Sequence, residues 1–396
     1  MISFAPSDEQ KLMIDAGQKL AKSLAAAIRQ TEASGLSAEL RSAAEEMGLG
    51  AAHLPESVGG AGLGLVTGVL LEEEIASGDP AAAFALGGTA SFALAMAEFA
   101  PERGADALAK PAAVAFGEPR PHKERAGLST VFSNGALSGE KSYVLGADRA
   151  ERFVVFAQVD ERAGYEGIGA FLVEKGNGVK ATPRARTLGL DAGSFGGIVL
   201  ENAKATRLDG KDFKRATLRF FAKHALLVAA RCVGLSRAAC EVTRAYVAER
   251  RAFGKPVAHF QAVAFTVADR AMDVDASRTL LHRAAWLWDG VDGSAAGGTS
   301  QAPEADENAA LLATARAVAY AHQTAMRCGD DGVQLHGGAG FMRDYPVEKY
   351  MRDAKQLALC GLPTSCAEQL AAAIELGREP DLGLVLPWPD SQGAFL

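Results

Sequence analysis

The 396-residue sequence lacks the features that mark several classes of protein. It has only five cysteines, an odd number, and none of their spacings matches a zinc site, so we expect reduced thiols and no bound metal. No apolar run reaches the length of a membrane-spanning helix, and the N-terminal segment has early acidic residues and no apolar core of the signal-peptide type. We therefore expect a cytoplasmic protein with no membrane partner.

The sequence also has no excess of positive charge. Its net charge is −7 and its isoelectric point is about 5.6, so nothing indicates binding to nucleic acid or to an anionic membrane surface. Hydrophobic residues make up 48% and charged residues 22%, which is ordinary for a globular chain. A chain of this length is expected to form two or three domains, and no repeat of solenoid period is visible.

Three zones of different composition follow one another along the chain. Residues 1–110 are Ala-rich with helical spacing of apolar positions, residues 111–208 contain short β-type runs, and residues 209–396 are helical again. These zones predict an N-terminal helical domain, a small antiparallel β-barrel or sandwich, and a C-terminal four-helix bundle. The expected fold class is therefore mainly α with a central β-domain.

Local signals support this division. Ser7 is a plausible N-cap of the first helix, and Ser133-Asn134-Gly135 and Ala163-Gly164 are typical of turns between strands. The four long C-terminal helices are expected in LRFFAKHALLVAARCVGLSRAACEVTRAYVAERRAFG, FQAVAFTVADRAMDVDASRTLLHRAAWLW, ADENAALLATARAVAYAHQTAMRCGDDG (ending at Gly332) and SCAEQLAAAIELGRE.

Six motifs, in the right order and over nearly the whole chain, resemble the acyl-CoA dehydrogenase flavoprotein family. They are PESVGGAGLG, NGALSGEKSYVLGADRAERFVVFA, GIGAFLVEKGNGV, RTLGLDAGSFGGIVLENAKAT, AERRAFGKPVAHFQAVAF and QLHGGAGFMRDYPVEKYMRDAK. The resemblance implies an oxidoreductase that desaturates acyl-CoA thioesters with FAD bound between the β-domain and the bundle. In that family a Glu removes the proton next to the carbonyl, and flavin N5 accepts a hydride from the next carbon.

The resemblance assigns two groups of dinucleotide contacts, which the family supplies largely across a subunit interface. Arg250 and Phe253 fall on the pyrophosphate and adenine contacts, and Arg suits a diphosphate because its planar fork bonds two oxygens. Gln334, Gly337 and Gly338 fall on the second contact, where glycine lets the backbone approach a phosphate. The alternatives are a surface Arg at a helix end and a plain helix-stop turn.

Other positions depart from the family pattern around the flavin ring. The family's T-E-P-x-x-G-S-D reads FGEPRPHKERAG here, so Gly117 replaces the Thr and the Gly-Ser-Asp is missing. Its W-I-T motif has become Tyr143-Val144-Leu145; Tyr143 can still shield a ring face, but the side chain of Leu145 cannot donate a hydrogen bond. We therefore expect the part of the FAD site that contacts the flavin ring to lack several of the family's side-chain contacts.

The catalytic carboxylate is missing as well. Gly361 occupies the usual Glu position, and the position used by a minority branch of the family falls at His224 and Ala225. His224 is a candidate base because an unperturbed imidazole titrates near pH 6.5, although a lone His on a long helix is more often structural. Cys360 is a weaker candidate because cysteine usually behaves as a small buried hydrophobe. Arg352 and Asp353 are better explained as an interhelical ion pair than as active-site groups.

This pattern favours the base-lacking subunit of a heteromeric acyl-CoA dehydrogenase, paired with a homologous Glu-bearing subunit in an α2β2 tetramer. Three alternatives remain: a flavin-dependent monooxygenase or oxidase of the same fold, a scaffold without flavin, and a homo-oligomeric dehydrogenase with an atypical base. The sequence does not identify the acyl chain.

Overall fold

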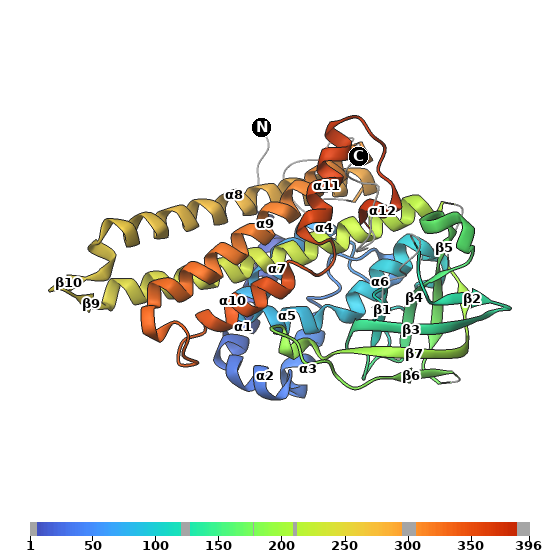
Figure 1. Ribbon diagram of the computed structural model, residues 1–396, viewed down its shortest axis with the longest axis horizontal. Coiled ribbons are helices and arrows are strands. Elements are labelled where there is room, and N and C mark those ends of the chain that lie inside the picture. The colour runs from blue at the N-terminus through green and yellow to red at the C-terminus, as the bar shows by residue number, and fades with distance from the viewer. Residues whose placement is uncertain (1–5, 120–126, 177, 209–211, 295–305, 386–396) are drawn as a thin grey trace.

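The computed structural model describes residues 6–119, 127–176, 178–208, 212–294 and 306–385. Helices precede and follow a central curled sheet, so the predicted fold class is confirmed (Figure 1). The predicted boundaries near residues 110 and 208 stay predictions. None of the helices in these ranges is by itself long and apolar enough to cross a membrane. Among these helices, only the bent pair Pro80–Leu86 and Gly88–Phe99, taken together, has the length and the apolar composition of a membrane span.

The N-terminal part consists of helices that pack against the bundle. They are α1 (Asp8–Ala26), α2 (Ile28–Ser34), α3 (Ala38–Glu46), α4 (Gly64–Gly78), α5 (Pro80–Leu86) and α6 (Gly88–Phe99). Ser7 caps α1 as predicted, because its hydroxyl accepts from the Gln10 N–H while the Gln10 side chain accepts from the Ser7 N–H. Burial on nearly all faces of α4 explains its largely apolar first half, and its three consecutive glutamates, Glu72, Glu73 and Glu74, are buried as well.

The central sheet is mixed rather than purely antiparallel. Its strands are β1 (Ala112–Ala115), β2 (Val131–Ser133), β3 (Ala136–Leu145), β4 (Arg152–Gln158), β5 (Ile168–Glu174), β6 (Val179–Ala181), β7 (Phe195–Lys204) and β8 (Thr206–Arg207). Most neighbours are antiparallel, but β1 and β2 both pair with β4 in parallel. Only the β2–β3 pair is joined by the predicted tight turn, where Asn134 and Gly135 both have positive φ.

The C-terminal bundle is built around one central helix. Its helices are α7 (Phe213–Glu249), α8 (Gln261–Asp292), α9 (Glu307–His336), α10 (Val347–Leu357), α11 (Thr364–Glu375) and α12 (Leu382–Val385). The four predicted helices correspond to α7, α8, α9 and α11, although α9 continues past Gly332. Helix α7 packs on α4, α8 and α9, and Gly234 permits close approach, because a Cβ there would lie 2.3 Å from the Glu73 carbonyl oxygen.

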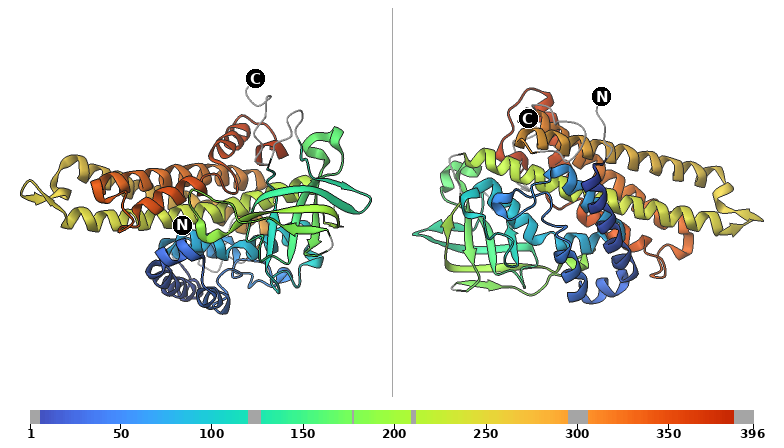
Figure 2. Two further views of the ribbon diagram at one scale, coloured as in Figure 1. Left: turned by 60° about the horizontal axis from the view of Figure 1, so that its bottom comes forward. Right: turned by 180° about the vertical axis from the view of Figure 1, so that it is seen from behind.

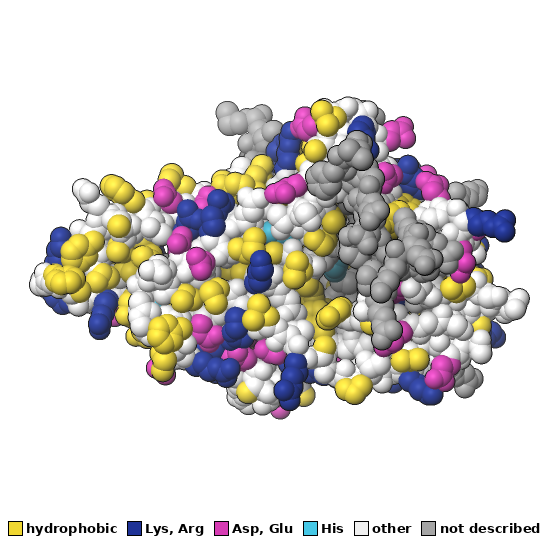
Figure 3. Space-filling model, in the orientation of Figure 1, with side chains coloured by type: hydrophobic (Ala, Val, Ile, Leu, Met, Phe, Trp, Pro, Cys, Tyr) yellow, Lys and Arg dark blue, Asp and Glu magenta, His cyan; other side chains and the backbone are white. Residues whose placement is uncertain are grey.

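The bundle extends well beyond the sheet along the long axis of the molecule. The short hairpin β9 (Arg251–Ala252) and β10 (Lys255–Pro256) forms its far tip, while the sheet lies at the opposite end (Figures 1 and 2). The surface seen in Figure 3 carries many hydrophobic side chains over the bundle. The two ends of α7 therefore lie in different environments, one beside the sheet and one at an exposed tip.

Candidate active site and flavin-contact residues

The two positions at which the family places a base converge in space. Gly361 lies between α10 and α11 and faces α7, where a Cβ at Gly361 would lie 3.5 Å from Cδ2 of His224 and 3.4 Å from Cα of Ala225. The φ of Gly361 is +69°, a conformation that favours glycine. The two base positions that the family resemblance assigns therefore lie next to each other, and neither carries a carboxylate.

His224 is poorly suited to accept a proton. Its ring is partly buried and stacks on Phe220 with 5.8 Å between centroids, and Nδ1 lies 3.3 Å from Oγ of Ser91. Burial, with a smaller contribution from the positive charge of Arg231, lowers the pKa of His224 to about 4. The imidazole is therefore neutral at pH 7 but is a weak base, and Ser91 gives it a structural partner that the sequence motifs did not indicate.

The other ionisable groups near this site are also constrained. Arg231 and Glu72 form a buried two-bond ion pair between α7 and α4, with both N–O distances at 2.7 Å. The Glu72 carboxylate is thus already bound by a guanidinium. Burial raises the pKa of the Cys360 thiol to about 12, so it carries no thiolate at neutral pH.

The two dinucleotide motifs meet at the far tip of the bundle. Arg250 ends α7, and its N–H donates to the carbonyl of Tyr246, whose ring stacks on His336 with 4.1 Å between centroids. His336 ends α9 and directly precedes Gly337. The tertiary fold therefore brings the ends of α7 and α9 together, as an assignment to one cofactor half requires.

These tip residues are available to a ligand. Phe253 is 95% exposed, and Arg250, Gln334, Gly337 and Gly338 are exposed too. Arg250 forms no ion pair with any residue that the structure describes, and no described atom lies within 4 Å of a Cβ built at Gly337 or Gly338. A free guanidinium beside open glycine backbone fits the diphosphate half of FAD.

The ring-side residues lie elsewhere. Tyr143 is exposed on β3 with a φ of +55°, and β3 belongs to the sheet at the end opposite the β9–β10 hairpin (Figure 1). At Gly117 a Cβ would lie only 3.0 Å from the Ser142 carbonyl oxygen, so the backbone leaves little room for the family's Thr. Within one chain the structure does not bring Tyr143 and the tip residues together. The departure from Gly-Ser-Asp falls largely on residues 120–126, outside the described residues.

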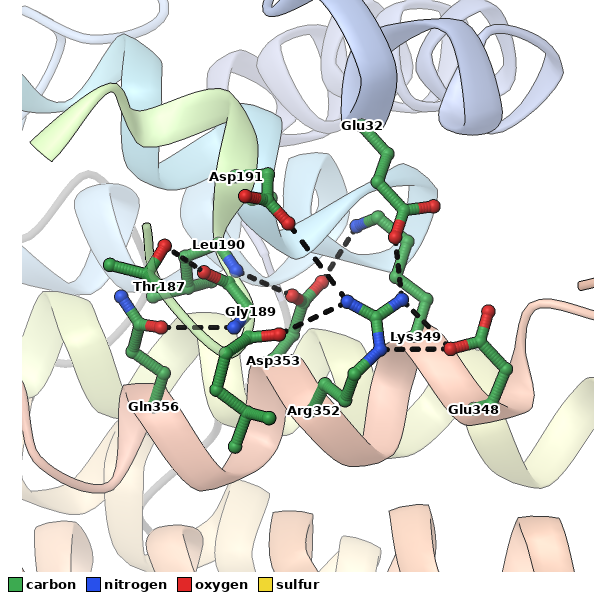
Figure 4. Close-up of polar contacts among 12 residues, drawn as sticks. Glu32, Thr187, Gly189, Leu190, Asp191, Glu348, Lys349, Arg352, Asp353 and Gln356 are labelled. Atoms are coloured by element: carbon green, nitrogen blue, oxygen red, sulfur yellow. Dashed lines mark hydrogen bonds and ion pairs between the residues drawn. The ribbon is translucent and has the colours of Figure 1, made fainter. Parts of the chain in front are cut away.

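Arg352 and Asp353 connect α10 to other parts of the chain (Figure 4). Arg352 pairs with Glu348 on α10 and with Glu32 on α2, at 2.8 and 2.5 Å, and Asp353 accepts from the Leu190 N–H. Lys349 completes the network by bridging Asp353 and Asp79, which precedes α5. These side chains fix α10 against the helical and β-domains and leave no free carboxylate for catalysis.

Comparison with known proteins identifies the family. The profile of the acyl-CoA dehydrogenase N-terminal domain matches residues 7–111, and that of the C-terminal domain matches residues 213–361. The probable acyl-CoA dehydrogenase YngJ of Bacillus subtilis (strain 168) is 31% identical over 84% of this chain and 87% of its own length. The chain belongs to the acyl-CoA dehydrogenase family. The members of this family are FAD-dependent oxidoreductases that act on CH–CH bonds of acyl-CoA.

A further relative supports the family, and a solved structure supports the fold. The probable acyl-CoA dehydrogenase FadE25 of Mycobacterium tuberculosis (strain ATCC 25618 / H37Rv) is 30% identical over 78% of this chain and 79% of its own length. The structure of butyryl-CoA dehydrogenase from Megasphaera elsdenii superposes with a TM-score of 0.82, covering 95% of this chain and all of the other at 24% identity. The family resemblance inferred from the motifs is therefore confirmed.

Proposed function

We propose that this chain is the base-lacking subunit of a heteromeric acyl-CoA dehydrogenase, in which a homologous Glu-bearing subunit carries out the proton abstraction. The observation that carries the proposal is the convergence of Gly361 and His224 on one site without a carboxylate. The α-proton of a thioester is weakly acidic, and an imidazole with a pKa of about 4 gives little driving force for its removal.

This chain retains the residues that contact the diphosphate half of FAD, but it lacks most of the family's contacts to the flavin ring. At the tip, Arg250, Gln334 and the Gly337–Gly338 backbone would hold the diphosphate half of FAD, and bound FAD would supply the hydride acceptor. At the sheet, Leu145 has no side-chain donor for the ring, and Tyr143 offers only a shielding face. Because the two parts lie at opposite ends of the chain, the tip serves a cofactor whose ring is held by a neighbouring subunit.

The exposed surface supports assembly. Large hydrophobic side chains of the bundle and its adjoining loops are left in contact with solvent: Phe253, Phe265, Met272, Phe341, Met342 and Met351. Large apolar side chains left exposed on one domain are consistent with a surface that a partner covers. A related subunit with the same bundle is the partner that our proposal requires, and an acyl-CoA thioester is the substrate of the complex.

The decisive experiment compares the chain purified alone with the chain co-expressed with a Glu-bearing homologue from the same genome. We expect the isolated chain to show little reduction of flavin by acyl-CoA under anaerobic conditions. The co-purified complex should hold FAD and reduce it with acyl-CoA. A flavin-to-protein ratio, measured by absorbance, reports how many chains share each cofactor.

Other results would identify the alternatives. Rapid anaerobic flavin reduction by the isolated chain would contradict the proposal and indicate a homo-oligomeric dehydrogenase with an atypical base. Oxygen-dependent turnover without α,β-desaturation would indicate an oxidase or monooxygenase. A colourless protein both alone and with every homologue would indicate a scaffold.

A further inference from the structure

Two of the five cysteines lie in contact between helices α7 and α9. All five belong to the described residues and carry free thiols. The sulfur of Cys240 on α7 lies 3.7 Å from the sulfur of Cys328 on α9, within hydrogen-bond distance for sulfur. The two helices stay close one turn further along, because a Cβ at Gly332 would lie 3.3 Å from Oγ1 of Thr243. The two thiols therefore face each other where the helices pack tightly.

The separation of the two sulfurs is small enough for a covalent bond to form. The sulfurs of a disulfide lie about 2.05 Å apart, so these two would have to approach by about 1.7 Å, which is 3.7 Å less 2.05 Å. Rotation of the two side chains about their Cα–Cβ bonds moves each sulfur through a distance of this order. We therefore expect α7 and α9 to keep their places when the bond forms.

A small cavity lies beside both sulfurs. Its volume is about 20 Å³, and both cysteines line it together with Arg270 and Asp331. A space of this size holds about one water molecule. Cys240 is partly exposed, whereas Cys328 is buried. A reagent little larger than water therefore reaches the sulfur of Cys240 first.

The surroundings of the pair make Cys240 the more reactive thiol. The hydrogen bond between the two sulfurs lowers the pKa of Cys240 and raises the pKa of Cys328. Burial opposes the lowered pKa of Cys240, Arg270 of α8 favours it, and the carboxylates of Asp273 and Asp331 oppose it. Both carboxylates are paired with the Arg270 guanidinium, at 3.0 and 3.4 Å. A thiolate is the form that reacts with oxidants, so oxidation is expected to begin at Cys240.

We propose that Cys240 and Cys328 form a site of reversible oxidation, at which hydrogen peroxide converts the two thiols into a disulfide between α7 and α9. The Cys240 sulfur attacks one peroxide oxygen, the O–O bond breaks, and the released hydroxide takes up a proton to give water and a sulfenic acid. The Cys328 sulfur then attacks the Cys240 sulfur, so that the S–S bond forms, the S–O bond breaks and a second water leaves. The two thiols lose two electrons, and one peroxide is reduced to two waters. Because this reaction needs neither FAD nor acyl-CoA, the inference does not rest on the proposed subunit role.

The first test treats the purified full chain with hydrogen peroxide after the reductant has been removed. Thiol titration of the product in denaturant should fall from five thiols to three, which is five less the two in the disulfide, and dithiothreitol should restore all five. Trypsin places the two cysteines in separate peptides, residues 238–244 and 328–343, and mapping without reduction should show these two peptides joined. No joined peptides, or a link between any other two cysteines instead, would overturn the proposed site.

The second test establishes which sulfur is attacked first. Cys328→Ser keeps a hydrogen-bond donor beside Cys240 but cannot form the disulfide, so peroxide should leave a sulfenic acid at Cys240 that dimedone labels. Cys240→Ser should abolish both the link and the labelling. The matched control is Cys366→Ser, which removes a thiol whose pKa is raised by burial and should leave the link intact. Circular dichroism checks that each variant is folded. Dimedone on Cys328 in Cys240→Ser, with none on Cys240 in Cys328→Ser, would overturn the assignment of Cys240.

Discussion

At the scale of single residues, the candidate site joins two positions that carry no carboxylate, and the imidazole at one of them is a weak base. Counting from RDAK and from ERRAFGK gave Gly361 and His224, and the fold places these two positions in contact. What the sequence did not provide was the burial that weakens His224 as a base, since a lone His has no pattern that reveals its surroundings.

His224→Gln tests whether the imidazole takes part in catalysis. The glutamine can keep a hydrogen bond to Ser91, so we expect acyl-CoA turnover by the complex to change by less than about threefold, against the roughly 100- to 10,000-fold loss typical of a general base. The measurement is steady-state turnover from pH 5 to 9. A loss of two orders of magnitude, together with a missing acidic limb in the pH profile, would show that His224 is the base after all.

Glu72→Ala tests the buried ion pair with Arg231. Removing one partner leaves a buried positive charge without compensation, so the free energy of unfolding should fall by about 3–5 kcal/mol. Urea denaturation followed by circular dichroism gives the value. As a control, Glu102→Ala removes an acid from an exposed pair whose N–O distance is 3.8 Å and should cost less than about 1 kcal/mol. If the two variants lose equal stability, the pair is not buried in solution.

At the scale of helices and strands, local signals predicted more than long-range pairing did. The Ser7 capping box and the Asn134-Gly135 turn were readable because each depends on neighbouring residues. The parallel pairing of β1 with β4 was not readable, because the register of strands far apart in sequence is set by tertiary packing. The sequence indicated only a charged run where helix α10 lies. The buried side chains of this helix include Glu348, Lys349 and Asp353, and such polar residues do not produce the apolar pattern that predicts a buried helix.

The start of helix α4 provides a pH-dependent test. The carboxylate of Asp289 accepts from the N–H groups of Leu65 and Val66, at 2.5 and 3.1 Å, yet burial outweighs these bonds and raises its pKa to about 7. An acid whose pKa is higher in the folded than in the unfolded state binds more protons when folded, so its contribution to stability falls as the pH rises from about 4 to 7.

Asp289→Asn should remove this dependence, because an amide oxygen still accepts from α4 and does not ionise. Wild-type stability relative to the variant should fall by up to about 1.4 kcal/mol per pH unit across that window and then level off above pH 7. Thermal unfolding of both proteins from pH 4 to 8 measures the difference. Parallel curves throughout would mean that Asp289 keeps an ordinary pKa in the folded state.

At the scale of the whole molecule, the sequence predicted the three zones and the family, but it could not show how far apart the flavin-contact residues lie. The family resemblance assigns Tyr143 to the flavin ring, and it assigns Arg250 to the dinucleotide half, largely across a subunit interface. The fold puts β3 and the β9–β10 hairpin at opposite ends, so a single chain cannot hold one FAD with both. Distances of this kind follow from the length of α7 and from its packing, not from any motif.

Arg250→Ala tests whether the tip serves a neighbour's cofactor. In the complex the guanidinium would face a diphosphate, and a charge-assisted hydrogen bond of that type contributes about 1.5–3 kcal/mol. The affinity of the complex for FAD should therefore fall roughly ten- to a hundredfold. The stability of the subunit itself should not change, because Arg250 is exposed and pairs with no described acid.

The neighbouring Arg251 provides the matched control for this prediction. It is also exposed, but its guanidinium donates to the Gly254 carbonyl at 2.9 Å within the hairpin, so Arg251→Ala should change FAD affinity by less than about threefold. FAD is titrated into the wild-type and variant complexes and followed by flavin fluorescence. Because Arg250 lies far from any ring contact of its own chain, a selective effect of Arg250→Ala requires a flavin that is shared between subunits. Equal losses in the two variants would instead indicate that the hairpin acts only through its shape or its total charge.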